Sequence, residues 1–185
     1  MVRSKIKPTN NEITFNKDDI IVSKTDARGI ITYANQVFQD VAGYREDELL
    51  GQPHNIIRHP DMPACVFKLL WDTIEEGKEI FAYVKNLAKN GDYYWVFAYV
   101  TPSFDVPGRI TGYHSNRRVP YPDALQKVIP LYKQLREMES QHGDTKEGMN
   151  AAFDHLCQSL EDQCISYDEF VFQLSEQTQL SNAIH

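Results

Sequence analysis

His54-Asn55-Ile56-Ile57-Arg58-His59-Pro60-Asp61-Met62-Pro63 is the stretch of sequence from which the fold can be worked out. Its ten residues include two histidines, one arginine, one aspartate and two prolines, which is more polar chemistry than an ordinary connecting loop carries. The prolines hold φ at about −65° and bias the residue before each of them away from helix, so this backbone is stiff. We therefore predict a rigid polar segment that presents Arg58, His59 and Asp61.

A buried helix is predicted directly after this segment, from Met62 to about Glu76. Its apolar residues recur at the spacing of one helix face, and they are Phe67, Leu70, Trp71 and Ile74. Gly77 supplies the stop, and Asp61 stands where a helix N-cap is expected. The simpler interpretation of the polar residues is a capped loop with an Arg58–Asp61 surface ion pair, and a ligand site is the alternative.

Strands and short helices are predicted before this segment. Two β-rich runs at 20–22 and 30–33 are separated by a turn composition at 26–29, which indicates a hairpin. Asn35 is a suitable N-cap for a short helix that ends at Gly43, and one or two further helical turns follow at 45–50. Short helices in quick succession between strands argue against a doubly wound sheet.

Three more strands are predicted after the long helix. The Asn90-Gly91 pair is a strong hairpin signal, and a two-residue loop there places Asn86 directly opposite Trp95 on one face of the sheet. A second hairpin loop at 104–108 leads into a last strand at 109–117. The fold class is therefore α+β, with five antiparallel strands and with the helices inserted between the second and third strands.

The composition changes after Arg118, and three helices are predicted in the rest of the chain. The first has an apolar stripe formed by Leu125, Val128, Ile129, Tyr132, Leu135 and Met138. The other two begin with capping-box patterns at 144–147 and 166–169. Their apolar stripes must be buried, either within one chain or against a second copy, and we expect a homodimer joined by the first of the three helices.

Composition excludes several classes of protein. The net charge of −7 argues against a nucleic-acid or anionic-membrane binder, and no apolar run approaches the roughly 20 residues that span a bilayer. Residues 1–17 lack a secretory signal, and the three cysteines form no disulfide framework, so we expect a cytoplasmic protein. The chain has no phosphate-binding glycine loop, nucleophile elbow or zinc-protease motif, which favours a sensor or adaptor over an enzyme.

Four short motifs of this sequence resemble the FAD-binding PAS sensor domain of bacterial aerotaxis transducers of the Aer type. They are Gly51-Gln52-Pro53-His54-Asn55, Arg58-His59-Pro60-Asp61-Met62-Pro63, Val84-Lys85-Asn86 and Lys89-Asn90-Gly91-Asp92-x-Tyr94-Trp95-Val96, where x is any residue. The resemblance covers 18–118 almost without gaps. It implies a PAS domain at 18–118. Residues 1–17 are polar and lack periodicity, so we expect a flexible or loosely docked lead-in, and the helical pattern after Arg118 predicts an all-helical appendage at 119–185.

The resemblance also implies a flavin, FAD, in the cup of the domain, with signalling through protein–protein contacts. The cofactor-binding residues that we expect are Arg58, His59, Asp61, Trp71, Asn86, Trp95 and His114. Cations suit the phosphates, and the Asn86 amide offers both a donor and an acceptor to the ring edge. His114 is expected near the point where a glutamine of flavin light sensors touches the flavin.

Departures from the family keep two alternatives open. Glu79-Ile80 replaces the Pro-Trp pair that aerotaxis sensors carry after the long helix, and the photo-adduct cysteine of light sensors is absent. The first alternative is haem, for which His54, His59 and His114 are available. The second is a cofactor-free interaction module whose interior is filled by Trp71, Trp95 and Phe97.

Overall fold

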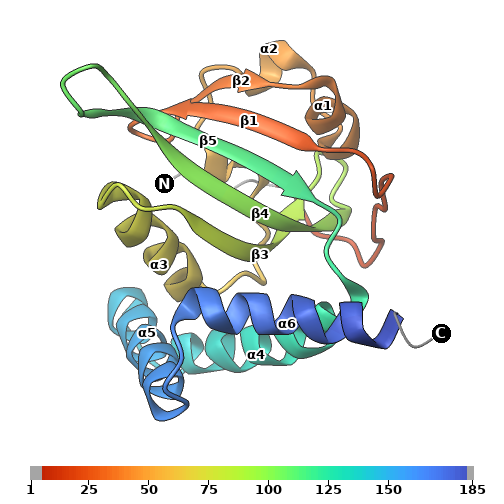
Figure 1. Ribbon diagram of the computed structural model, residues 1–185. Helices are drawn as coiled ribbons and strands as arrows, with labels where there is room; N and C mark the ends of the chain where they lie inside the picture. The colour runs from red at the N-terminus through yellow and green to blue at the C-terminus, as the bar shows by residue number, and fades with distance from the viewer. Residues whose placement is uncertain (1–5, 183–185) are drawn as a thin grey trace. The chain divides into compact units, whose positions relative to one another are not determined.

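The computed structural model describes the backbone of residues 6–182 and the side chains of residues 6–174. Five antiparallel strands form one sheet in the order β2-β1-β5-β4-β3 (Figure 1). The strands are β1 Ile21–Asp26, β2 Ile31–Ala34, β3 Ile80–Leu87, β4 Tyr93–Phe104 and β5 Ile110–Arg118. The helices are α1 Gln36–Ala42, α2 Glu46–Leu49, the 3-10 helix η1 His54–Ile57, α3 Ala64–Glu75, α4 Pro122–Ser140, α5 Thr145–Asp162 and α6 Tyr167–Asn182. The expected α+β class, with helices between the second and third strands and three more at the end, is confirmed.

The chain divides into two compact units. The first contains the chain up to residue 59 together with 73–119, and the second contains 60–72 together with the segment from residue 120 onward. The whole sheet therefore belongs to the first unit. The N-terminal three quarters of α3, residues 64–72, belong to the second unit, with α4, α5 and α6.

The β1–β2 hairpin forms where its turn composition predicts it. One carboxylate oxygen of Asp26 accepts hydrogen bonds from the backbone N–H groups of Arg28 and Ile30, both at 2.9 Å. Gly29 takes a positive φ of 78°, which a glycine adopts without strain. α1 then lies beside β1, and α2 lies beside β2 (Figure 1). Asn35 caps α1 by accepting from the Phe38 N–H at 3.0 Å, as expected.

The β3–β4 hairpin differs from the expected register by one residue. Gly91 N–H donates to the Ala88 carbonyl at 3.0 Å, and Ala88 N–H donates to the Asp92 carbonyl at 2.7 Å. The loop therefore holds three residues, with Gly91 at a φ of 95°, instead of the two-residue turn that Asn-Gly suggested. Asn86 pairs with Tyr94 and Lys85 pairs with Trp95. The prediction that Asn86 faces Trp95 was wrong.

This register defines two faces of the sheet, because side chains alternate along each strand. We call them the Arg117 face and the His114 face. The Arg117 face carries Ile21, Ser23, Val84, Asn86, Tyr94, Val96, Ala98, Tyr113 and Arg117. The His114 face carries Val22, Lys24, Phe81, Tyr83, Lys85, Trp95, Phe97, Tyr99 and His114.

Residues 9–13, in the segment expected to be a flexible or loosely docked lead-in, lie along the start of β4. Thr9 N–H donates to the Gly91 carbonyl and Ile13 N–H to the Tyr93 carbonyl, both at 2.7 Å, and Tyr93 N–H donates to the Asn11 carbonyl at 3.0 Å. The Thr9 hydroxyl also donates to Asp92 at 2.5 Å. This part of the lead-in is docked on the tip of the β3–β4 hairpin.

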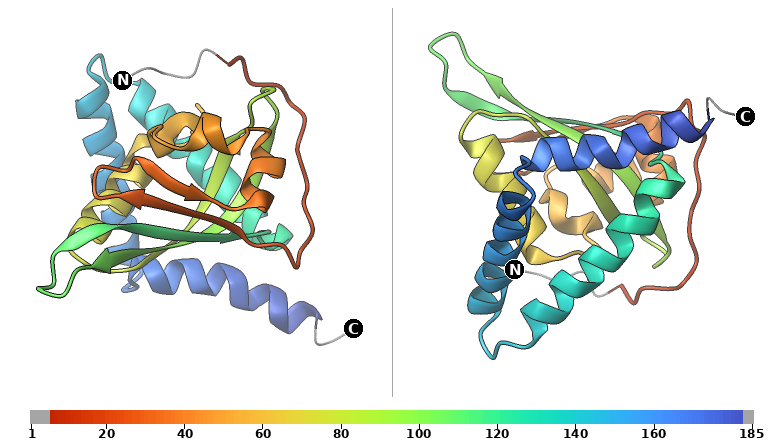
Figure 2. Two further views of the ribbon diagram at one scale, coloured as in Figure 1. Left: turned by 90° about the horizontal axis from the view of Figure 1, so that it is seen from above. Right: turned by 60° about the horizontal axis from the view of Figure 1, so that its bottom comes forward.

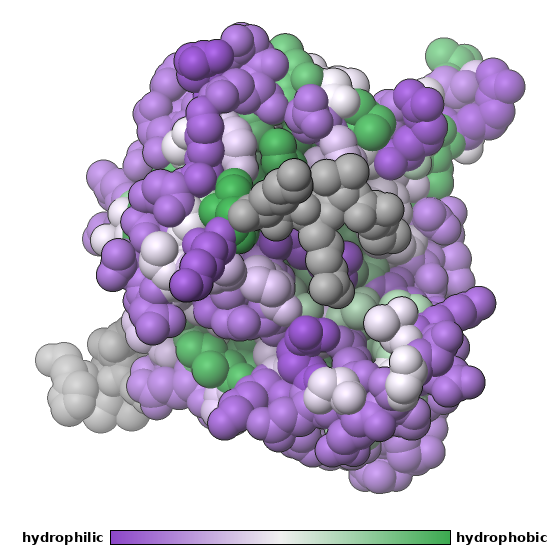
Figure 3. Space-filling model, turned by 180° about the vertical axis from the view of Figure 1, so that it is seen from behind, coloured by the Kyte–Doolittle hydropathy of each residue, from purple (hydrophilic) through white to green (hydrophobic). Residues whose placement is uncertain are grey.

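In the second unit, α4 lies against both α5 and α6 (Figure 2). The predicted caps form, since Asp144 accepts from the Lys146 and Glu147 N–H groups and Ser166 accepts from the Glu169 N–H. Tyr132 and Leu135 of the predicted α4 stripe are buried within the single chain. They are therefore not a free dimer surface. Seen from behind, the surface is mostly hydrophilic, with hydrophobic side chains in small separate groups (Figure 3).

Candidate ligand-binding site

Arg117 is the centre of a buried polar cluster on the Arg117 face of the first unit. Its side chain comes from β5, and only 2% of the residue is exposed. Nη2 donates a hydrogen bond to the hydroxyl of Ser23 on β1, and the guanidinium carbon lies 4.5 Å from the ring centroid of Phe38 on α1. Burial lowers the pKa of Arg117 to about 10, yet the group is still charged at neutral pH. The cluster therefore holds a cation away from water.

His54 of η1 joins the same cluster. Its Nε2 lies 3.0 Å from the Ser23 hydroxyl oxygen, and its ring stacks on Phe38 with the centroids 6.0 Å apart. Burial of the ring, helped by the nearby Arg117 charge, lowers the pKa of His54 to about 3. His54 is consequently a neutral imidazole at neutral pH, and its Nε2 atom is already engaged with Ser23.

Several buried polar atoms on this face have no hydrogen-bond partner among the described residues. They are Nε and Nη1 of Arg117, Nδ2 of Asn86 and the hydroxyl oxygen of Tyr94. Leaving a buried donor unsatisfied costs about 1–3 kcal/mol, and more for a charged group. Burial also raises the pKa of Tyr94, so its hydroxyl remains a neutral donor. A ligand that brings hydrogen-bond acceptors to this face would satisfy all of these groups.

The polar segment quoted first reaches the edge of the same sheet. Arg58 forms an isolated antiparallel backbone bridge with Asn86 of β3. His59 is 2% exposed, and its ring packs edge-on against Tyr93 with the centroids 6.0 Å apart. The structure therefore brings together Arg58, His59 and Asn86, three of the seven residues predicted from the sequence to bind a cofactor.

The other four nominated residues lie elsewhere. Trp95 and His114 are on the His114 face, and the Nε2 atom of His114 lies 3.2 Å from Oδ1 of Asn116 on the same strand. Asp61 and Trp71 belong to the second unit. α3 begins at Ala64, so Asp61 lies three residues before the first helical residue and not at the adjacent N-cap position.

Sequence reasoning missed Arg117, Tyr94 and Ser23. No quoted motif contains Ser23 or Arg117, and the motif at 89–96 contains Tyr94 without indicating its role. Only the pairing of β1, β5 and β4 brings the three residues onto one face. The alternation of the last strand was the one available signal. It places Arg117 and His114 on opposite faces of the strand, so one of the two can belong to the site. The sequence analysis chose His114.

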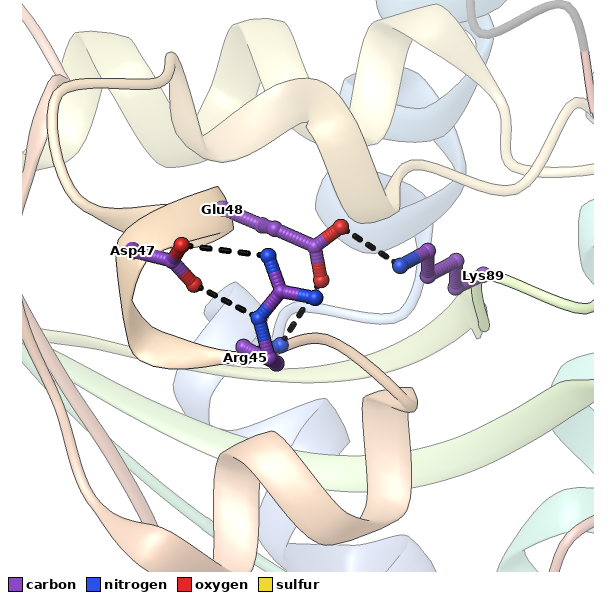
Figure 4. Close-up of polar contacts among 4 residues, drawn as sticks. All are labelled: Arg45, Asp47, Glu48 and Lys89. Carbon is purple, nitrogen blue, oxygen red and sulfur yellow. Dashed lines mark hydrogen bonds and ion pairs between the residues drawn. The ribbon is translucent and has the colours of Figure 1, made fainter.

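A surface clasp ties α2 to the β3–β4 hairpin at the rim of this unit. Lys89 Nζ lies 2.5 Å from Oε1 of Glu48, and Arg45 contacts both carboxylate oxygens of Asp47 (Figure 4). The Lys89 N–H donates to the Ala42 carbonyl at 2.9 Å, which fixes the hairpin to the end of α1 as well. The exposed ion pairs add little energy, so the backbone hydrogen bond from Lys89 to Ala42 is the firmer of these links.

A family model described as the PAS fold matches residues 31–117, which run from β2 to the end of β5. Residues 31–117 have the PAS fold. The chain is 45% identical to the aerotaxis receptor of Escherichia coli (strain K12) over 118 residues, 64% of this chain and 23% of the relative. It is 29% identical to a nitrogen fixation regulatory protein of Klebsiella pneumoniae over 99 residues, 54% of this chain and 20% of the relative. The chain thus spans about a quarter or less of the length of these relatives.

Solved structures agree on the fold. The dark structure of the blue-light photoreceptor Aureochrome1 LOV superposes with a TM-score of 0.55 at 21% identity, covering 60% of this chain and 82% of that one. A light-oxygen-voltage domain studied with a flavin analogue gives a TM-score of 0.53 at 19% identity, covering 62% of this chain and 86% of that one. The resemblance of the sequence to PAS sensors of the aerotaxis type is confirmed.

In the part of the chain that the structure describes, no group of three or more histidine, cysteine, aspartate or glutamate side chains is placed to hold a metal ion. None of the helices described there is both long enough and apolar enough to cross a membrane.

Proposed function

We propose that this PAS domain binds a flavin, FAD, on the Arg117 face and acts as a sensor in signal transduction. The observation that carries the proposal is a set of buried donors on that face for which the described residues provide no partner: two nitrogens of Arg117, the Asn86 amide and the Tyr94 hydroxyl. The flavin ring edge is rich in carbonyl oxygens and ring nitrogens, which are acceptors for such donors. Bound flavin would supply a group that changes its redox state.

The polar segment contributes the second part of the proposed site. Arg58 and His59 can contact the phosphates or the polar edge of the cofactor, and Arg58 is bridged to Asn86 on the neighbouring strand. Asp61, Trp71, Trp95 and His114 remain nominated by family resemblance alone. Support for FAD in particular comes from the 45% identity to the aerotaxis receptor and from the matching motifs at 51–63 and 84–96.

The signal that we propose is the redox, oxygen or energy state, which the protein reports through contacts with another protein and not through catalysis. Cytoplasmic location and a homodimer belong to the same proposal. The dimer surface would have to use α4 residues other than Tyr132 and Leu135, such as the exposed Ile129. Light scattering at high protein concentration tests the oligomeric state directly.

A cofactor-free interaction module is the second candidate, and one observation favours it. Phe38, His54 and Arg117 pack against one another, so part of the interior is already filled by side chains of the chain itself. The version expected from sequence, with Trp95 and Phe97 filling the interior, does not fit, because both residues lie on the His114 face. The comparisons give no support for haem.

The test is flavin occupancy after supplementation with FAD, in the wild type and in two asparagine variants. Asn86→Ala removes a donor from the Arg117 face, whereas Asn116→Ala changes the His114 face of the same sheet. We expect occupancy to fall in Asn86→Ala and to be retained in Asn116→Ala, with unchanged far-UV circular dichroism in both. Equal occupancy in the two variants would reject the Arg117 face as the site.

A further inference from the structure

Arg117 is a buried cation without an anionic partner among the described residues. The Ser23 hydroxyl accepts a hydrogen bond from its Nη2 atom, and the Phe38 ring lies against its positive charge. The buried polar and charged side chains described in the first unit are Ser23, His59, Asn86 and Arg117 itself, and none of them is a carboxylate. Charged side chains are rarely buried unless they are paired. The described residues therefore provide no counter-charge for this guanidinium.

Tyr94 does not supply the missing negative charge. Its hydroxyl is an acidic group that interacts electrostatically with Arg117, and an ionised phenolate there would pair with the guanidinium. Burial nevertheless raises the pKa of Tyr94, despite the nearby positive charge of Arg117. Tyr94 is therefore neutral at neutral pH, and its hydroxyl has no partner among the described residues.

The other members of the cluster add no negative charge either. His54 is a neutral imidazole, because burial and the charge of Arg117 lower its pKa to about 3. The Ser23 hydroxyl and the Asn86 amide are dipoles without net charge. Arg117 keeps its own charge at neutral pH, since burial lowers its pKa only to about 10. The cluster is consequently a positive charge surrounded by neutral hydrogen-bonding groups.

We propose that Arg117 is the counter-ion for a negatively charged group of the ligand, so that the site selects an anionic ligand over a neutral one. The Nε and Nη1 atoms of the guanidinium are available to donate to such a group. A guanidinium forms stronger hydrogen bonds with an anionic acceptor than with a neutral one. The low dielectric of a buried site increases this difference. A neutral ligand would leave the buried charge unpaired.

The identity of the anionic group rests on the proposed function, and a flavin has two such groups. The oxidised flavin ring is neutral, and the ring carries one negative charge after it has taken up two electrons and one proton. The phosphates of FAD are negative in both redox states. The structure assigns the ring to Arg117, because the Asn86 amide and the Tyr94 hydroxyl, which suit ring carbonyls, lie on the same face of the sheet.

This assignment has a consequence for the redox chemistry of the bound ring. A positive charge beside the ring stabilises its anionic reduced form and leaves the neutral oxidised form almost unaffected. Arg117 therefore makes the domain bind reduced flavin more tightly than oxidised flavin. By linkage, the same preference raises the midpoint potential of the bound flavin.

The test measures midpoint potential and affinity in the wild type and three variants. Arg117→Met removes the charge, Arg117→Lys keeps a charge at the same position, and Arg118→Met removes an exposed charge from the next residue of β5. The potential is measured during anaerobic titration with dithionite, which supplies the electrons while water supplies the proton. The dissociation constants of oxidised riboflavin, FMN and FAD are measured in parallel.

We expect the ratio of the affinity for reduced flavin to the affinity for oxidised flavin to fall about tenfold in Arg117→Met. For a two-electron couple this ratio corresponds to a midpoint potential about 30 mV lower than in the wild type. Arg117→Lys should keep most of the wild-type potential, and Arg118→Met all of it. If the phosphates are the anionic group, Arg117→Met instead leaves the potential unchanged and weakens FAD and FMN about tenfold more than riboflavin, which supports an anion site with a different occupant.

Three results would overturn the proposal. In the first, Arg117→Met changes neither the potential nor the preference for phosphorylated flavins. In the second, Arg117→Lys changes them as much as Arg117→Met, which would show that Arg117 acts through shape or hydrogen bonding and not through charge. In the third, Arg118→Met has the same effect as Arg117→Met, which would show a general effect of net charge.

Two further outcomes are also decisive. If Arg117→Met binds no flavin, retained binding in Arg117→Lys supports the proposal and loss of binding in both variants overturns it. If Arg117→Met does not fold, Arg117→Gln, which is also uncharged, replaces it under the same criteria.

Failure of the proposed function can be told apart from failure of this inference. A wild type that takes up neither FAD, FMN nor riboflavin rejects the flavin proposal. Benzoate and benzamide, which are planar compounds of similar shape and different charge, then replace the flavins. The Tm of the wild type should be higher in benzoate than in benzamide, and the difference should disappear in Arg117→Met. Equal Tm values of the wild type in the two compounds would overturn the anion site as well.

Discussion

Replacing Arg117 with methionine should stabilise the ligand-free protein and weaken flavin binding. The side chain is 2% exposed, and Nε and Nη1 have no hydrogen-bond partner among the described residues. Methionine has a similar length and fills the same space without a charge. Under the proposed function, this buried charge serves ligand binding at the expense of stability, which is common at binding sites.

The size of the effect follows from the burial of the charge. A fall in the pKa of Arg117 from 12.5 to about 10 corresponds to about 3 kcal/mol lost by the charged form in the folded protein. The hydrogen bond to Ser23 and the contact with Phe38 offset about 2 kcal/mol of this loss. The net gain in Arg117→Met is about 1 kcal/mol, or about 2–4 °C in Tm for a chain of this length.

The assay is thermal unfolding of the ligand-free protein, followed by titration with FAD. Arg118→Met is the matched control, because Arg118 is the next residue on β5 and is exposed. We expect a higher Tm and lower flavin occupancy in Arg117→Met, and neither change in Arg118→Met. A Tm lowered by several degrees, with occupancy unchanged, would refute the reasoning and favour a core that is complete without a cofactor.

Three further predictions concern stability. The pKa of His54 falls from 6.5 to about 3 on folding, so neutral His54 contributes stability above pH 6.5 that is lost as the pH falls. Because of this residue, urea unfolding should give a free energy of unfolding about 1–2 kcal/mol lower at pH 5 than at pH 7. The same loss between pH 7 and pH 5 in His54→Gln would contradict the assignment. Gly112→Ala should cost more than about 2 kcal/mol, because its Cβ would overlap the Thr25 carbonyl oxygen across the β1–β5 pairing; a Tm within about 2 °C of wild type would be the contrary result. Lys89→Met should change the free energy of unfolding by less than about 1 kcal/mol, because the Lys89–Glu48 pair is solvent-exposed despite its 2.5 Å contact. A larger loss of stability in urea unfolding would show that this ion pair is a structural requirement.

The order of elements could be predicted from sequence because local signals mark them. Asp26 and Gly29 specify the first turn, and Asn35 and Gly43 specify both ends of α1, each through its own backbone chemistry. The register of the β3–β4 hairpin could not be predicted, because Asn-Gly fits both a two-residue turn and a three-residue loop. A one-residue difference moves every side chain to the other face.

The candidate site was predictable only where its residues are contiguous. Arg58 and His59 lie in one recognisable motif, at 58–63, and Asn86 lies in another, at 84–86. Tyr94 also lies in a quoted segment, at 89–96, but Arg117 lies in none, and only strand pairing brings the two residues together. The burial of Glu139 could not be predicted, because the Cys65 N–H from which it accepts a hydrogen bond is 74 positions away. An isolated glutamate on a helix is usually a solvated side chain.

The visible absorption spectrum of the purified chain after supplementation with FAD, recorded with and without dithionite, tests the central claim most directly. The account predicts the two bands of an oxidised protein-bound flavin, retained through gel filtration and bleached by dithionite. A colourless protein after gel filtration, with a folded circular dichroism spectrum, would contradict the account and leave the PAS domain as an interaction module.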